Sequence, residues 1–236
     1  MRHCRIRSCE GISRSYSPYC PLHRKRKARN GHPLQTAITA KELKPHRQAV
    51  RQWLKRRASL SATELLERLW GGLLQDAKVY IETAEAGHPY IRHYLEAYQV
   101  ILKVADDNPS KDIIEVLLAM GYYHELYPKR FHSDEAFGFQ VARRFRALTE
   151  AHVGISWDNV NQRTKKVYKD VSPRTLKTLW ALLLDSRLPL YGIKIAEKDL
   201  AEKTYWRPND SMVTKAILGS TPSDPASDSS SEGVTP

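Results

Sequence analysis

The chain contains 236 residues, enough for one or two domains, and 41% of them are hydrophobic, which is sufficient for a buried core. Its net charge of +12 is uneven, because residues 1–57 hold 16 Lys and Arg against two acids (+14), whereas the rest of the chain sums to −2. No apolar run approaches the ~18 residues that a membrane span requires, and no apolar segment follows the basic N-terminus as it would in a signal peptide. These features argue against a membrane protein or a secreted one and predict a cytoplasmic location.

All three cysteines lie within the first 20 residues, in the pattern C-x4-C-x10-C-x2-H formed by Cys4, Cys9, Cys20 and His23. Three thiolates and one imidazole complete a tetrahedral structural zinc site and leave no coordination position open for chemistry. So short and polar a segment cannot fold on its own apolar surface, so the metal would act as its core. We therefore expect structural Zn2+ in a module spanning residues 1–35. The alternative is three free thiols and a surface histidine.

A run of basic residues follows His23 directly. A rigid metal module would hold this run on one face, where it could neutralise phosphates and release counterions. The alternative is a solvated charged helix, as most charge runs are. The residues expected to contact nucleic acid in this run are Arg24, Lys25, Arg26, Lys27 and Arg29.

The ligand pattern and its sequel resemble the small CCCH zinc module of phage and mobile-element DNA-binding proteins, often found beside HNH nuclease domains. In that family C-x4-C is followed by C-x2-H, a basic helix and a terminal G-[DH]-P-L turn, matched here by Gly31, His32, Pro33 and Leu34. Ser8 replaces a glycine that is common in the family. The resemblance covers residues 4–34. It implies zinc and nucleic-acid binding by a protein encoded by a bacterium or a phage, and it implies no enzymatic activity.

A capping box formed by Thr39 and Glu42 predicts a helix that runs to about Arg57 within a basic linker, residues 36–60. This helix could lie along a phosphate backbone or join the zinc module to the body, and a solvated connector is the alternative. Its residues expected to contact nucleic acid are Arg47, Arg51, Lys55, Arg56 and Arg57.

Apolar residues at three- and four-residue steps predict an α-helical domain over residues 61–215. A second capping box, Ser61 to Glu64, opens a helix to about Glu85, in which Gly71-Gly72 suggests a close helix contact or a kink. Further helices are expected at 89–105, 109–126 and, capped by Ser133, 133–152. A tyrosine stripe at 90, 94 and 98 could stack nucleobases, but core packing is favoured.

Positive charge returns between residues 143 and 177. A helix through Val160 and Val167 and another opened by Ser172-Pro173 are expected there, and with the preceding helix they could form a helix-turn-helix variant or simply pack as charged helices. A short strand at 188–195, a helix at 196–203 and a disordered acidic tail at 216–236 complete the chain. The secondary basic patch comprises Arg143, Arg144, Arg163, Lys165, Lys166 and Lys169.

No catalytic constellation is evident in the sequence. His124 and His132 are not flanked by the strand pair that an HNH nuclease requires, and Gly71-Gly72 lacks the following Lys-Ser or Lys-Thr of a phosphate-binding loop. The zinc set itself leaves no site for a bound water. We therefore expect no enzyme.

The sequence as a whole predicts a mainly α protein with a small N-terminal zinc-binding module, a multi-helix body and a disordered C-terminal tail. The expected function is that of a zinc-containing DNA-binding accessory or regulatory protein. The alternatives are an RNA-binding protein, since phosphate contacts do not distinguish the two polymers, and a protein-interaction adaptor or an accessory subunit of a nuclease or recombinase complex. The helical body could serve a protein partner or self-association.

Overall fold

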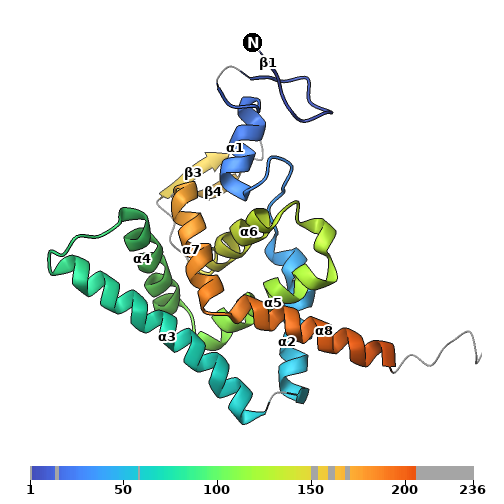
Figure 1. The fold of residues 1–236 in the computed structure, drawn as a ribbon, viewed down its shortest axis with the longest axis vertical. Helices are drawn as coiled ribbons and strands as arrows, with labels where there is room; N and C mark the ends of the chain where they lie inside the picture. The colour runs from blue at the N-terminus through green and yellow to red at the C-terminus, as the bar shows by residue number, and fades with distance from the viewer. Residues whose placement is uncertain are drawn as a thin grey trace, which may run out of the picture. The chain divides into compact units, whose positions relative to one another are not determined.

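The computed structural model describes residues 2–13, 16–57, 59–149, 154–158, 163–167 and 171–205, and in these it is mainly α-helical, as predicted (Figure 1). Two short antiparallel strand pairs accompany the helices: β1 with β2, and β3 with β4. The elements are β1 (Arg2–His3), β2 (Ile12–Ser13), α1 (Pro21–Asn30), α2 (Ala40–Arg57), α3 (Leu60–Glu85), α4 (Arg92–Asp107), α5 (Ser110–Leu126), the 3-10 turn η1 (Pro128–Arg130), α6 (Asp134–Arg146), β3 (Gly154–Asp158), β4 (Arg163–Val167), α7 (Pro173–Asp185) and α8 (Leu188–Tyr205).

Helix α5 is the centre of the core, because every residue from 113 to 123 is buried. A helix that is apolar on all sides must be enclosed by other elements. Helices α2, α3, α4 and α6 all pack against it, and α7 closes the core by packing on α4 and α6. Ile113 and Leu117 are fully buried, and each contributes roughly 1.5–3 kcal/mol by the usual value for such side chains.

Helix α2 is part of this core rather than a solvated connector. Leu43 and Val50 on its inner face are buried against α5, and residues 1–199 form one compact unit. The sequence left a solvated connector open as the alternative because apolar residues are sparse in α2 and its charged positions are many. Its few apolar residues recur on one face, and that suffices to dock it. None of the helices among the described residues is long and apolar enough to span a membrane.

Local capping signals located the starts of three helices, α2, α6 and α7, correctly. The Thr39 hydroxyl accepts from the Glu42 N–H at 3.1 Å, and the Glu42 carboxylate accepts from the Thr39 N–H at 3.4 Å, so this capping box is confirmed. Ser133 and Ser172 cap α6 and α7 as predicted. The prediction of Ser61 as a cap is wrong, because the hydroxyl of Ser59 accepts from the Ala62 N–H and α3 begins at residue 60.

A strand pair replaces one predicted helix. The sequence predicted a helix through Val160 and Val167, but residues 163–167 form β4, which pairs antiparallel with β3. The β-branched and aromatic residues of the two segments favour a pleated pair over a helix. Helix α6 also ends at Arg146 rather than near residue 152. The three-helix arrangement suggested for 143–177 is therefore wrong in the part that the structure describes, while Val160, Lys169 and the tail at 216–236 lie outside it.

The predicted strand at 188–195 is also wrong, because these residues open helix α8. A Cβ added to Gly192 would overlap the carbonyl oxygen of Leu118, and one added to Gly121 would overlap that of Pro189. The backbones of α5 and α8 therefore touch at two glycines, a contact that only a residue without a side chain permits. Arg187, with φ of 61°, makes the turn from α7 into α8. Tertiary packing thus overrides the strand preference of the two isoleucines in this segment.

The predictions for α3 and α4 are met only in part. A Cβ on Gly71 or Gly72 would meet nothing within 4 Å, and α3 is continuous through both, so the suggested close contact is wrong. Tyr94 and Tyr98 are half-buried against the helix core, with ring centroids 6.3 and 4.8 Å from that of Tyr80, whereas Tyr90 is exposed.

Candidate metal centre and basic surface

The first 23 residues bring the four predicted ligands together through two local structures. Strands β1 and β2 pair, and the Cys4 N–H donates to the Gly11 carbonyl at 2.9 Å, so the segment carrying Cys4 and Cys9 doubles back. Cys20 is the N-cap of α1 without a side-chain capping bond, which leaves its sulfur available. His23 follows one helical turn later and lies on the same face as Cys20.

The ligand atoms of Cys4, Cys9, Cys20 and His23 all lie within 4.8 Å of one another. The Nδ1 of His23 is 3.5 Å from the Cys4 sulfur and 3.3 Å from the Cys20 sulfur, and the Cys9 and Cys20 sulfurs are 3.8 Å apart. A disulfide would need about 2.05 Å. Four ligands placed about 2.0–2.3 Å from one centre have tetrahedral edges of roughly 3.3–3.8 Å. The predicted clustering is confirmed, and its geometry is compatible with one metal ion.

The surroundings of Cys4 lower the pKa of its thiol and so favour the thiolate form. Burial raises its pKa, but backbone hydrogen bonds from Cys20 and Ile6 and a side-chain hydrogen bond with His23 outweigh burial and lower the pKa to about 6. Because a metal ligand must be deprotonated, this environment favours the binding form.

Gly11 is a supporting residue that the sequence analysis missed. Its N–H lies 3.4 Å from the Cys9 sulfur and lowers the pKa of Cys9, but burial and the neighbouring sulfurs raise it further, so the net shift is upward. A Cβ on Gly11 would lie 2.9 Å from the Cys20 Cβ and 3.2 Å from the sulfurs of both Cys9 and Cys20. The residue must therefore be small for the cluster to close.

The end of α1 joins the metal segment to the helical body. Gly31 has φ of 80°, and a Cβ there would lie 2.8 Å from the Glu135 carbonyl oxygen, so the backbone approaches α6 closely. Gln140 of α6 donates to the Asn30 side chain at 3.4 Å and accepts from the Ile38 N–H at 2.9 Å. These contacts are polar and buried, and they fix α1 on α6. The turn at residues 31–34, which matches the terminal turn of the CCCH family pattern, therefore also helps to dock α1 on α6.

The basic residues of α1 lie next to those of α6. Arg24, Lys25, Lys27 and Arg29 are exposed and Arg26 is half-buried. One cavity of about 280 Å3 between α1, α6 and the start of α7 is lined by Lys25, Arg29, Arg143 and Arg146, together with Ala28, Val171, Pro173 and Leu176.

An Arg143 N–H donates to the Arg29 carbonyl oxygen at 3.3 Å, so the two basic segments are in direct contact. The structure thus unites part of the N-terminal run with part of the secondary basic patch. Arg146, which the predicted patch omitted, belongs to this cavity. Arg163, Lys165 and Lys166 lie on β4, where Lys165 pairs with Ser156 across the sheet.

Several of the α2 residues predicted to contact nucleic acid form ion pairs within the protein. Glu115 of α5, only 3% exposed, accepts from the Nε–H of Arg47 and from the Nε–H of Arg51, both at 2.7 Å. Arg56 lies 3.9 Å from Asp199, and Lys55, Arg56 and Arg57 are all exposed. Intramolecular ion pairs therefore occupy part of the positive charge that the sequence assigned to nucleic acid.

Arg144 differs from its neighbours in the basic patch because its Nε–H is buried, and no partner for it is found among the described residues. Burial, followed by the positive charges of Arg47 and Arg143, lowers its pKa. Arg144 as a whole is half-buried, so it adds positive potential at the edge of the basic patch.

Comparison of the chain with protein-family models, with curated proteins and with solved structures finds no match.

Proposed function

We propose that this protein is a zinc-stabilised nucleic-acid-binding protein that contacts the phosphates of DNA through the basic surface shared by α1 and α6. Three sulfurs and one imidazole nitrogen are the donor set that zinc prefers in structural sites. Four protein ligands fill a tetrahedral ion, so the metal would supply folding energy rather than chemistry.

The zinc would replace the missing core of the N-terminal segment. Between residues 2 and 30, Cys4 and Cys20 are its buried apolar residues among those described, and Ile12 and Leu22 are exposed. A segment of this kind folds when the free energy of metal binding, on the order of 10 kcal/mol in comparable modules, offsets chain entropy. Loss of the metal would therefore leave α1 held only by the contacts of its C-terminal end with α6.

The observation that carries the proposal is the cavity between α1 and α6. Four cationic side chains from segments 114 residues apart line it, and no acidic residue belongs to its described lining. Four cations in one concave surface raise the local potential and concentrate a polyanion there. Cations of this surface that neutralise DNA phosphates would release the counterions condensed on the DNA, and this release would contribute affinity.

The test is a salt titration of binding to duplex DNA by the full-length, zinc-loaded chain. We expect the variant with both Lys25→Ala and Arg146→Ala to bind every DNA sequence more weakly. Its plot of log affinity against log salt should be shallower by about 0.9 for each lost phosphate contact. The matched control carries Lys78→Ala and Lys103→Ala, which remove two exposed charges from α3 and α4.

Equal binding by the two double variants would refute the basic surface as the contact site. Stronger competition by single-stranded RNA than by duplex DNA would assign the surface to RNA, the alternative polymer. The setting in a phage or other mobile element, as an accessory or regulatory factor, is supported by the resemblance of residues 4–34 alone.

A further inference from the structure

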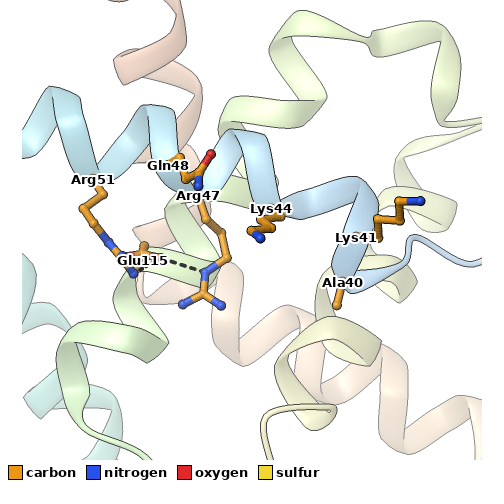
Figure 2. Close-up of a pocket in the computed structure, with 7 residues that line it drawn as sticks. All are labelled: Ala40, Lys41, Lys44, Arg47, Gln48, Arg51 and Glu115. Carbon is orange, nitrogen blue, oxygen red and sulfur yellow. Dashed lines mark hydrogen bonds and ion pairs between the residues drawn. The ribbon is translucent and has the colours of Figure 1, made fainter.

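A second basic cavity lies between α2 and α5, with a volume of about 450 Å3 (Figure 2). Lys44, Arg47, Gln48 and Arg51 recur at three- and four-residue steps, so they share one face of α2. Figure 2 shows Arg47 and Arg51 converging on Glu115, with Lys44 beside them and Lys41 extending away from this group. The lining carries four basic residues against the single acid Glu115, a net charge of +3.

Glu115 holds the two guanidinium groups in place without exhausting their donors. Its carboxylate accepts from the Nε–H of Arg47, the Nε–H of Arg51 and one terminal N–H of Arg51, at 2.7, 2.7 and 3.0 Å. Each guanidinium carries five N–H donors, so most of the ten are left for another acceptor. A buried carboxylate between two arginines therefore preorganises a forked donor array, the arrangement that matches phosphate oxygens.

The surroundings add positive potential to this cavity. The Nε–H of the half-buried Arg144 is buried, and the positive charges of Arg144 and Arg47 repel each other. A further acid, Asp112, is 4.0 Å from Arg47, but its side chain is half exposed, so it compensates little of the charge. An anion bound beside Arg47 would relieve the repulsion between Arg47 and Arg144.

We propose that the cavity between α2 and α5 binds a small ligand through a phosphate monoester or diphosphate group. Arg47 and Arg51 donate to the phosphate oxygens with the N–H groups that Glu115 does not engage, and Lys44 supplies a third positive charge. Ala40 is the one apolar residue in the described lining, and the lining contains no aromatic ring to stack a base. The site therefore recognises the phosphate group itself. This inference does not depend on the proposed nucleic-acid function.

The experiment is calorimetric titration of the full-length, zinc-loaded protein with pyrophosphate, with the zinc content measured before and after. We expect saturable binding at one site per chain. Lys44→Ala should weaken it about tenfold or more, the loss expected from one charge-assisted hydrogen bond. The matched control is Lys55→Ala, which removes the same charge from an exposed position on α2 outside this cavity.

Absence of saturable heat with the wild-type protein, or equal weakening by Lys44→Ala and Lys55→Ala, would overturn the proposal. The variant with Lys25→Ala and Arg146→Ala should keep its pyrophosphate affinity, whereas Lys44→Ala should keep its affinity for duplex DNA. Failure of one proposal can thus be separated from failure of the other.

A competition experiment distinguishes two sources of the phosphate group, the end of a nucleic-acid strand and a free small molecule. Displacement of pyrophosphate by an oligonucleotide with a 5′-phosphate, but not by the same oligonucleotide without it, would assign the site to a strand end. No displacement by either would assign it to a free phosphate-bearing small molecule. Equal displacement by both oligonucleotides would refute recognition of a monoester or diphosphate group.

Discussion

The contact between α5 and α8 predicts opposite outcomes for one substitution made at two helical glycines. Gly71→Ala places a methyl group in open solvent on α3, so only helix propensity changes and the protein should gain about 1 kcal/mol of stability. Gly121→Ala gains the same propensity, but its methyl group must occupy the space of the Pro189 carbonyl oxygen. Neither backbone can move aside without disturbing the core.

The magnitude at Gly121 follows from that overlap. Overpacking a core typically costs roughly 1–3 kcal/mol. The upper end applies because the obstructing groups, the Pro189 carbonyl and the Ile193 nitrogen, both belong to the backbone of α8. After the propensity gain we expect a net loss of about 2 kcal/mol or more, so the two variants should differ by about 3 kcal/mol. This is a large share of the roughly 5–15 kcal/mol that stabilises a typical domain.

The assay is urea denaturation followed by far-ultraviolet circular dichroism on both variants and the wild-type protein, with ΔG taken from midpoints at a common slope. A Gly121→Ala protein as stable as the Gly71→Ala protein would refute the backbone contact. It would also remove the reason for α8 being a helix where the local sequence favours a strand.

Two further predictions concern the metal and a buried carboxylate. Cys20→Ser should abolish zinc binding, as measured by native mass spectrometry, and most of the DNA affinity. The helical circular dichroism signal of the body should persist. A variant that retains one zinc and full DNA binding would contradict the ligand assignment. Burial raises the pKa of Glu42, but hydrogen bonds from Arg130 and Tyr123 outweigh it and hold the pKa below its ordinary 4.5. A lowered pKa contributes stability above pH 4.5 that is lost as the pH falls through the folded-state value. Glu42→Gln should therefore be less stable than wild type in urea at pH 7, and the difference should narrow below pH 4.5; a constant difference would disprove the linkage.

Several parts of the candidate sites could be predicted because their signals are local. The four metal ligands occupy 20 consecutive residues, and C-x2-H places Cys20 and His23 one helical turn apart whatever the rest of the chain does. The caps at Thr39, Ser133 and Ser172 depend on a hydroxyl and an N–H only three residues away.

The roles of the charged residues could not be predicted in the same way. Arg51 meets Glu115 across 64 residues and Arg143 meets Arg29 across 114 residues, and no periodicity in either segment encodes the partner. Charge counting therefore put Arg47, Arg51 and Lys25 into one class. The fold separates them, because two are bound to a buried carboxylate and one lies in a cavity of cations.

The amino-acid sequence by itself determined the mainly helical class, three of the helix starts and the set of residues that can hold a metal. These depend on interactions within one or two turns of the chain. Only the tertiary structure decided that residues 188–195 are helical, that residues 163–167 are a strand, and which arginines surround each cavity. The reason is that close backbone packing and ion pairing between distant segments outweigh local preferences of about 1 kcal/mol.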